Sequence, residues 1–174
     1  MLGWQPLTLG LLSVRDPRDA SVSMAQRFNT PLRHTVHWLA NDCNRLLRLA
    51  SQGHLLLRYE DRFFDDPSAV ARLAQVLGLR PAPATVEAIF ARYRTEAVRD
   101  FAGSLLSLPS ERLTQVGPFT MDRTTQILQP QIGDGRSGKW RELPAAEPIW
   151  LNRFFKPFLD TFDYPAANDG LPSS

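Results

Sequence analysis

The hydrophobic pattern near the amino terminus predicts a strand that leads directly into a helix. Residues 7–14 (LTLGLLSV) form a short apolar run without helical spacing, which is typical of a strand buried on both faces. Asp16 and Pro17 follow, and this pair suits the N-cap and the first position of a helix. The first elements are therefore a strand, a tight turn and a helix.

A long amphipathic helix and a second strand come next. Between residues 31 and 52, apolar side chains recur at steps of three and four, and Gly53 ends the pattern. Residues 55–59 (LLLRY) form a second short apolar run. Alternation of strands with helices predicts an α/β layered fold with parallel strands, of which the sequence supplies two.

The remaining pattern predicts helices and one long loop. Residues 66–78 and 85–100 each have an apolar face with helical spacing. Residues 147–162 form an aromatic helix face that is expected in the core. Between residues 101 and 141 the periodicity fades and glycine, proline, serine and threonine accumulate, which predicts a loop. Residues 165–174 predict a disordered tail.

Composition adds one feature to this picture, the dominance of arginine among the basic residues. The chain has 174 residues, 43% hydrophobic and 22% charged, which predicts one ordinary globular domain. Lysines stand only at positions 139 and 156, so the positive charge is carried almost entirely by arginine. Arginine favours bidentate recognition of phosphate or carboxylate. No basic run or stripe accompanies the net charge of +2, so no nucleic-acid partner is expected.

The cysteine and histidine content argues against a disulfide-stabilised or metal-binding protein. Cys43 is the single cysteine, so no disulfide framework forms and no Cys/His cluster is available for zinc. His34 and His37 lie one turn apart without further metal ligands, and no metal is expected. The apolar start lacks a basic segment, and no apolar run reaches membrane-spanning length. We therefore expect a soluble, cytoplasmic protein without membrane insertion.

Residues 14–23 (VRDPRDASVS) carry the most informative chemistry. An arginine leaves a buried strand just before a helix begins, where free backbone N–H groups and the helix dipole favour an anion. Arg15 adds a bidentate donor, and Ser23 adds a hydroxyl one to two turns along. The pattern predicts a phosphate site. The alternative is a surface ion pair of Arg15 with Asp16 or Asp19.

This segment resembles the 3′-phosphate-binding motif of sulfotransferases that use 3′-phosphoadenosine-5′-phosphosulfate (PAPS). In that family an arginine and a serine eight residues later hold the 3′-phosphate, and Arg15 and Ser23 match that spacing. Residues 57–61 (LRYED) resemble the family's strand-end Tyr-Glu-Asp segment, whose tyrosine lies near the adenine. The resemblance implies this role for Tyr59. Without it, Tyr59 reads equally well as a half-buried strand residue with its hydroxyl toward solvent.

Further segments extend the resemblance in the family's order. Residues 133–141 (GDGRSGKWR) look like its glycine-rich loop ending in Gly-x-Trp, which closes over the 3′-phosphate. Glycines there bring backbone N–H groups to a phosphate, and the resemblance implies Gly135, Arg136 and Ser137 as contacts. The loop departs from the best-known pattern, which places an arginine-lysine pair ahead of the second glycine. Arg136 is the expected replacement.

The dinucleotide fingerprint G-x-G-x-x-G also fits this loop, but it requires a strand before it and a helix after it. The pattern predicts neither, because Pro130 and Pro144 interrupt the flanking stretches. Outside the loop, residues 66–79 resemble the family's next helix, and residues 162–164 (FDY) resemble its usual ending. Glu60 and Asp61 fit a solvated strand end better than a catalytic carboxylate pair.

The resemblance implies a P-loop NTPase-like parallel sheet flanked by helices, formed by residues 1–164. It implies PAPS as co-substrate and a hydroxyl or amine as sulfate acceptor. The family's phosphate loop, with its lysine, and its histidine base lie upstream of the Arg-Asp-Pro segment, where this chain has fourteen residues. We therefore expect a fold incomplete at the N-terminus with an exposed sheet edge. If these residues are the complete gene product, we expect weak nucleotide binding and negligible sulfation.

Two other functions remain open. The first is a non-catalytic nucleotide-binding or interaction remnant of the fold. The second is a phosphoryl-transferring kinase on a similar fold, which ranks lowest because no GxxxxGK[ST] run occurs.

Overall fold

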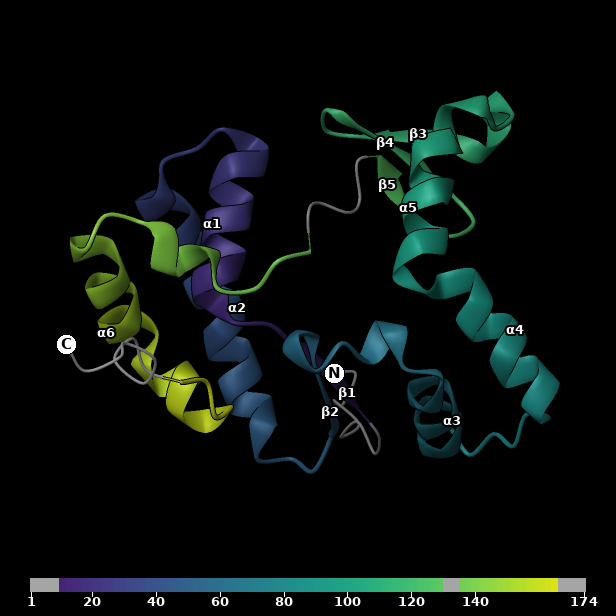
Figure 1. The fold of residues 1–174 in the computed structure, drawn as a ribbon, viewed down its shortest axis with the longest axis horizontal. Coiled ribbons are helices and arrows are strands. Elements are labelled where there is room, and N and C mark those ends of the chain that lie inside the picture. Colours follow the sequence, from purple (N-terminus) through teal and green to yellow (C-terminus); the bar gives the residue numbers. More distant parts are fainter. Residues whose placement is uncertain (1–9, 130–134, 166–174) are drawn as a thin grey trace, which may run out of the picture. The chain divides into compact units, whose positions relative to one another are not determined.

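The computed structural model describes residues 10–129 and 135–165, and the chain divides into two compact units. The first unit comprises the described residues of 1–61 and 136–174, and the second comprises those of 62–135. Each unit has its own sheet (Figure 1). Apart from Pro165, the predicted tail lies outside the described residues, as do residues 7–9 of the first predicted strand. Within the described ranges, no helix is long and apolar enough to cross a bilayer.

The first unit is an α/β arrangement in the order that the sequence predicts. Its main elements are β1 (Leu11–Val14), α1 (Pro17–Phe28), α2 (Leu32–Ala50), β2 (Leu55–Arg58), a short 3₁₀ helix (Lys139–Glu142) and α6 (Ala146–Thr161). The strands β1 and β2 pair in parallel, with Leu11 opposite Leu55 and Val14 opposite Arg58. The prediction of an α/β fold with parallel strands is confirmed.

The parallel sheet is less covered than the sequence predicts. Leu12 and Val14 are buried, whereas Leu11 and Ser13 of the same strand are exposed. Because side chains alternate between the two faces of a strand, β1 is covered on one face only. The prediction of burial on both faces is wrong. In the described residues the parallel sheet has two strands, so no complete P-loop NTPase-like sheet is present there.

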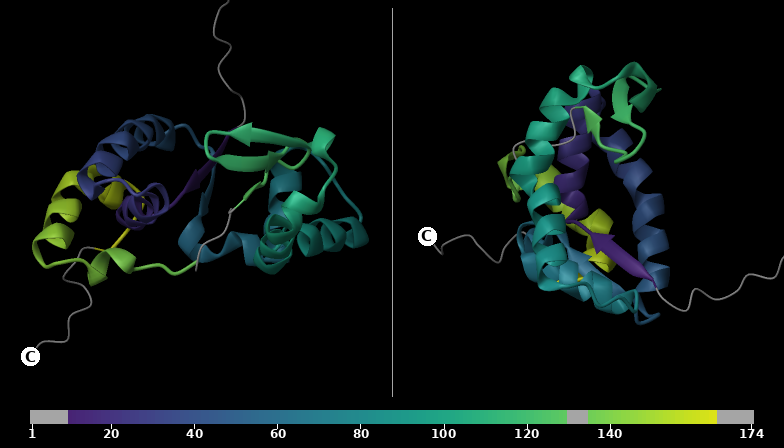
Figure 2. Two further views of the ribbon diagram at one scale, coloured as in Figure 1. Left: turned by 90° about the horizontal axis from the view of Figure 1, so that it is seen from above. Right: turned by 90° about the vertical axis from the view of Figure 1, so that its right-hand side faces the viewer.

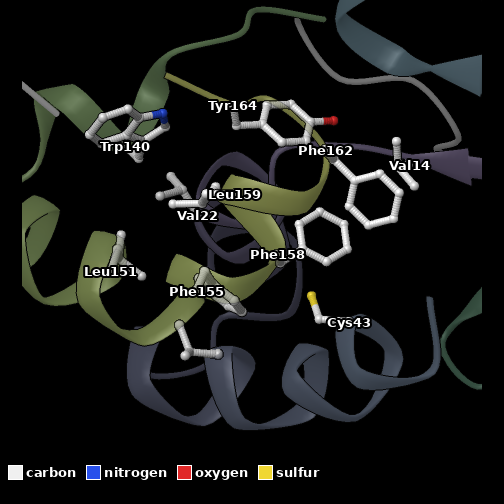
Figure 3. Packing of buried hydrophobic residues seen from close by; sticks show 11 residues of the cluster. Val14, Val22, Cys43, Trp140, Leu151, Phe155, Phe158, Leu159, Phe162 and Tyr164 are labelled. Atoms are coloured by element: carbon white, nitrogen blue, oxygen red, sulfur yellow. The ribbon is translucent and has the colours of Figure 1, made fainter. Parts of the chain in front are cut away.

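The core of the first unit is built around α6. Figures 1 and 2 show α1, α2 and α6 packed together in this unit. Phe155 and Phe158 of α6 are buried against Val22 of α1 and Cys43 of α2 (Figure 3). Val14 reaches the same cluster from the end of β1. The predicted role of the aromatic face of residues 147–162 in the core is confirmed.

In the second unit, residues 85–100 are helical as predicted, but they belong to two helices rather than one. Here α3 (Pro67–Val76) is followed by α4 (Pro83–Tyr93) and α5 (Thr95–Ser104). The backbone of Arg94 is extended between the last two. Thr95 starts α5 by donating its N–H and hydroxyl to the Asp65 carboxylate, at 3.3 and 2.8 Å. This cap comes from 30 residues earlier in the chain, so local periodicity does not reveal the break.

The predicted loop at residues 101–141 contains an antiparallel sheet, which corrects that prediction. The strands are β3 (Leu113–Val116), β4 (Phe119–Asp122) and β5 (Leu128–Gln129). Gly117, with φ of 57°, opens the two-residue turn between β3 and β4. Glycine adopts this left-handed conformation without the steric cost of a side chain. The turn residues that suggested a loop therefore form a hairpin.

Asp122 is a buried polar centre of the second unit. Its carboxylate accepts hydrogen bonds from the Arg112 guanidinium at 3.1 and 2.9 Å. The N–H and hydroxyl of Thr125 also donate to it, at 3.0 and 2.7 Å. The Arg112 hydrogen bonds lower the pKa of Asp122 to about 2, with further lowering by Thr125. The sheet is thus joined to its flanking segments by one ionised carboxylate.

We expect the second unit to lose stability as the pH falls from about 4 to about 2. The pKa of Asp122 in the folded chain, about 2, lies below the ordinary aspartate value of 3.8. A lowered folded-state pKa stabilises the fold above the ordinary value and loses this effect as the carboxyl becomes protonated. Denaturant unfolding between pH 2 and 5 should be less pH-dependent for Asp122→Asn than for wild type. The exposed Asp100→Asn serves as control, and equal slopes for all three proteins would contradict the prediction.

Candidate functional site

The candidate site lies at the carboxyl ends of β1 and β2. Arg15 directly follows β1, and Tyr59 directly follows β2. Because Val14 pairs with Arg58, these next residues emerge side by side. The guanidinium carbon of Arg15 lies 4.5 Å from the centroid of the Tyr59 ring. Open α/β sheets bind their ligands beyond the carboxyl ends of parallel strands, which is where this pair lies.

Ser23 joins the pair from α1. The Arg15 Nη2 donates to the Ser23 hydroxyl at 3.4 Å, a long hydrogen bond. The Arg15 Nε is buried and has no hydrogen-bond partner among the described residues. Arg15 forms no ion pair with Asp16 or Asp19 in the described part of the chain, because both carboxylates are engaged elsewhere. The structure therefore brings Arg15, Ser23 and Tyr59 together, and the alternative of a surface ion pair is wrong.

The N-terminus of α1 is less suited to an anion than the sequence suggests, because an N–H group of its first turn is capped and two carboxylates are buried there. Pro17 has no N–H, and the Arg18 N–H donates to the Asp16 side chain at 2.9 Å. The Ala20 N–H donates to the Asp16 carbonyl oxygen at 2.9 Å. The carboxylates of Asp16 and Asp19 are buried at this helix end. An anion at this place would have to be held by side chains rather than by the helix N-terminus.

Arg18, which the sequence does not mark as structural, is a fully buried cation beside the site. Its guanidinium pairs with the Asp16 carboxylate, with Nη2 to Oδ2 at 2.7 Å. It also donates to the Asn152 side chain and to the carbonyl oxygen of Pro165. The face of the guanidinium lies 3.9 Å from a ring centroid of Trp140. Arg18 thereby joins α1, α6 and the end of the described chain.

The glycine-rich loop is tied to α1 through Asp19. The Gly138 and Trp140 N–H groups both donate to the Asp19 carboxylate, the second at 3.2 Å. Gly138 has φ of 88°, which favours glycine at this turn. Asp19 lies one helical turn before Ser23, so both side chains are on the same face of α1. The loop is therefore anchored on the helix face that carries Ser23.

The three loop residues expected to contact a ligand have different surroundings. Arg136 forms an ion pair with Glu142 at 2.8 Å, and both side chains are exposed. Ser137 is exposed, and Gly135 belongs to the second unit. Among the described residues, the loop is anchored through the N–H groups of Gly138 and Trp140. Sequence reasoning named Gly138 only as part of the motif and considered Asp19 only as an ion-pair partner for Arg15.

Glu60 links the two strand ends to the C-terminal part of the first unit. Its Oε1 accepts the Asp16 N–H at 3.0 Å, and its Oε2 accepts the Tyr164 hydroxyl at 2.9 Å. Burial, followed by the effect of the nearby Glu60 charge, raises the pKa of Tyr164 well above its ordinary value. The interpretation of Glu60 as a solvated strand end is therefore wrong, whereas the neighbouring Asp61 is exposed.

No histidine or cysteine adds chemistry to this cluster. The His34 ring lies 4.6 Å from that of Trp38, and the His37 ring lies 5.5 Å from that of Phe154. Burial raises the pKa of the Cys43 thiol to about 12, so it stays protonated in the core. The described ranges contain no group of three or more side chains arranged to hold a metal ion. The cluster of Arg15, Ser23 and Tyr59 is equipped to hold an anion.

Comparisons of the chain with protein-family models, curated proteins and solved structures find no match.

Proposed function

We propose that this chain binds PAPS by its 3′-phosphate and belongs to the class of proteins that transfer sulfate from PAPS to a hydroxyl or amine. The observation that carries the proposal is the meeting of Arg15, Ser23 and Tyr59 at the ends of two parallel strands. The sequence spacing of arginine and serine predicts such a site, and the two side chains are in hydrogen-bonding contact.

The chemistry of the cluster suits a phosphate monoester. A guanidinium presents paired N–H donors that match two oxygens of one phosphate, and a serine hydroxyl donates to a third. The buried Arg15 Nε lacks a partner in the described structure, so the cation retains hydrogen-bonding capacity. Ser23 holds Arg15 only through a long contact of 3.4 Å, which a phosphate oxygen can replace.

The proposed role of these residues is to hold the nucleotide. Transfer of a sulfuryl group proceeds in line and depends on electrostatic stabilisation of the moving charge and on deprotonation of the acceptor. Arg15 and Ser23 would bind the phosphate remote from the moving group, with Arg136 and Ser137 of the loop closing over it. The resemblance also implies a place for Tyr59 near the adenine, but the contact that its ring makes here is with the Arg15 guanidinium. The binding energy of such remote groups serves to orient the sulfuryl group for transfer.

Isothermal titration with 3′-phosphoadenosine-5′-phosphate (PAP) and with AMP tests the proposal. We expect micromolar PAP binding by wild type and much weaker AMP binding, since AMP lacks the 3′-phosphate. Arg15→Ala should weaken PAP binding by about 10- to 100-fold, the effect of losing a charge-assisted hydrogen-bonding group. Arg45→Ala, which removes an exposed arginine of α2, is the matched control. Equal affinity of the folded wild type for PAP and AMP, or no binding of either, would contradict the proposal.

A non-catalytic nucleotide-binding protein is the second candidate, because the cluster itself contains binding groups and no base. Incubation with sulfur-35-labelled PAPS and a simple phenol or aryl amine distinguishes the two. Labelled product from wild type, lost in Arg15→Ala, supports the transferase. PAP binding without labelled product is the result expected for these residues alone, and it would assign them nucleotide binding without transfer.

A further inference from the structure

The orientation of the Arg15 guanidinium depends on few contacts. A guanidinium has five N–H donors, and strong anchoring uses several of them at once. Within the described ranges, Nη2 donates one long hydrogen bond to Ser23, at 3.4 Å, and Nε has no hydrogen-bond partner. Such a bond is too weak to fix the plane of the group. Another contact is needed to hold Arg15 in one direction.

The aromatic ring of Tyr59 supplies that contact. The guanidinium carbon lies over the ring, 4.5 Å from its centroid, within the range of cation–π attraction. A guanidinium placed over a ring face keeps its N–H donors at its rim, where they remain available to an anion. The ring therefore restricts the tilt of Arg15 without occupying the donors that a phosphate requires.

The Tyr59 ring is itself held in register with Arg15. The residues that follow them, Glu60 and Asp16, are joined by the hydrogen bond from the Asp16 N–H to the Glu60 carboxylate at 3.0 Å. The other oxygen of Glu60 accepts the Tyr164 hydroxyl at 2.9 Å. This connection fixes the ends of β1 and β2 against each other directly beside the stacked pair.

We propose that Tyr59 is a positioning residue that orients Arg15 toward the 3′-phosphate and so sets the preference for nucleotides that carry this group. The inference rests on the proposed function. It differs from a role of Tyr59 near the adenine, because that role would affect every adenine nucleotide alike. A positioning role acts through Arg15 and affects only ligands that Arg15 binds.

Titrations of Tyr59→Leu and Tyr59→Phe with PAP and AMP separate these roles. Tyr59→Leu should weaken PAP binding about tenfold and leave AMP binding unchanged, whereas Tyr59→Phe retains the ring and should stay within about twofold of wild type. In an Arg15→Ala background, Tyr59→Leu should have no further effect. Tyr93→Leu is the matched control, since Arg92 lies over that ring at 5.6 Å in the second unit. Tyr59→Met repeats the test if Tyr59→Leu does not fold.

Equal weakening of PAP and AMP binding by Tyr59→Leu, persisting in the Arg15→Ala background, would overturn the positioning role. A ligand-free measurement separates this failure from failure of the proposed function. The Arg15 Nε–H signal in a ¹⁵N–¹H spectrum, assigned with Arg15→Lys, should be shifted upfield by the ring in wild type and Tyr59→Phe but not in Tyr59→Leu. A shifted signal in a wild type that binds no PAP would overturn the proposed function, and the selectivity role with it. An unshifted signal in a wild type that binds PAP would overturn the positioning role alone.

Discussion

Replacing Arg18 by methionine should lower the free energy of unfolding of the first unit by about 3–5 kcal/mol. Arg18 is fully buried, and its removal leaves the Asp16 carboxylate buried without its cation. The change also removes the hydrogen bonds to Asn152 and Pro165 and the stacking on Trp140. The methionine side chain fills much of the same volume, so loss of the charge and its hydrogen bonds dominates.

Urea unfolding followed by tryptophan fluorescence measures this effect, because Trp140 lies against Arg18 in the same core. Lys156→Met is the matched control, since it breaks an exposed ion pair with Asp160 on α6. Exposed pairs of this i,i+4 type contribute only about 0.5 kcal/mol. A loss of less than about 1 kcal/mol in Arg18→Met would mean that the buried pair adds little beyond its packing.

Most elements of the first unit could be predicted because their signals are local. Asp16 and Pro17 mark the start of α1, with the Asp16 side chain accepting the Arg18 N–H as an N-cap does. Gly53, with φ of 70°, follows the end of α2 as expected. The contact between Arg15 and Tyr59 also follows from simple rules, because neighbouring parallel strands end at the same edge of a sheet.

The missed features depend on partners that are distant in sequence. The Asp19 carboxylate accepts the Gly138 N–H across 119 residues, and Glu60 accepts the Tyr164 hydroxyl across 104 residues. From sequence, an aspartate or glutamate is assigned to the surface, because buried carboxylates are rare unless they are paired. Whether such a group is buried is decided by donors that only the folded chain brings to it.

The capped N–H group and the buried carboxylates at the N-terminus of α1 were also not predictable from local sequence. The sequence shows an arginine before a helix start, which favours phosphate binding by backbone N–H groups. It does not show that the buried Asp16 carboxylate accepts the Arg18 N–H, or that the buried Asp19 carboxylate accepts N–H groups of the glycine-rich loop. Binding of an anion at this strand edge is therefore expected to depend on Arg15. Binding should be sensitive to salt, because the attraction is between charges at a partly exposed position.

Asp19→Ala should both destabilise the first unit and release the glycine-rich loop. The substitution leaves the N–H groups of Gly138 and Trp140 without their acceptor, and Trp140 is buried. Leaving a buried donor unsatisfied costs about 1–3 kcal/mol, so for the two donors a loss of about 2–6 kcal/mol in the free energy of unfolding is expected. Because the loop is then no longer fixed beside Ser23, PAP affinity should fall as well.

Urea unfolding and the near-ultraviolet circular dichroism of the tryptophans measure the first effect, and PAP titration measures the second. Asp19→Asn keeps one oxygen acceptor and should have an intermediate effect on both. Asp160→Ala removes an exposed aspartate of α6 and should change neither. Unchanged unfolding in Asp19→Ala would show that the loop does not depend on this carboxylate. Reduced stability with unchanged PAP affinity would show that the loop supports the fold without contributing to the nucleotide site, leaving Arg15 and Ser23 as its phosphate-binding groups.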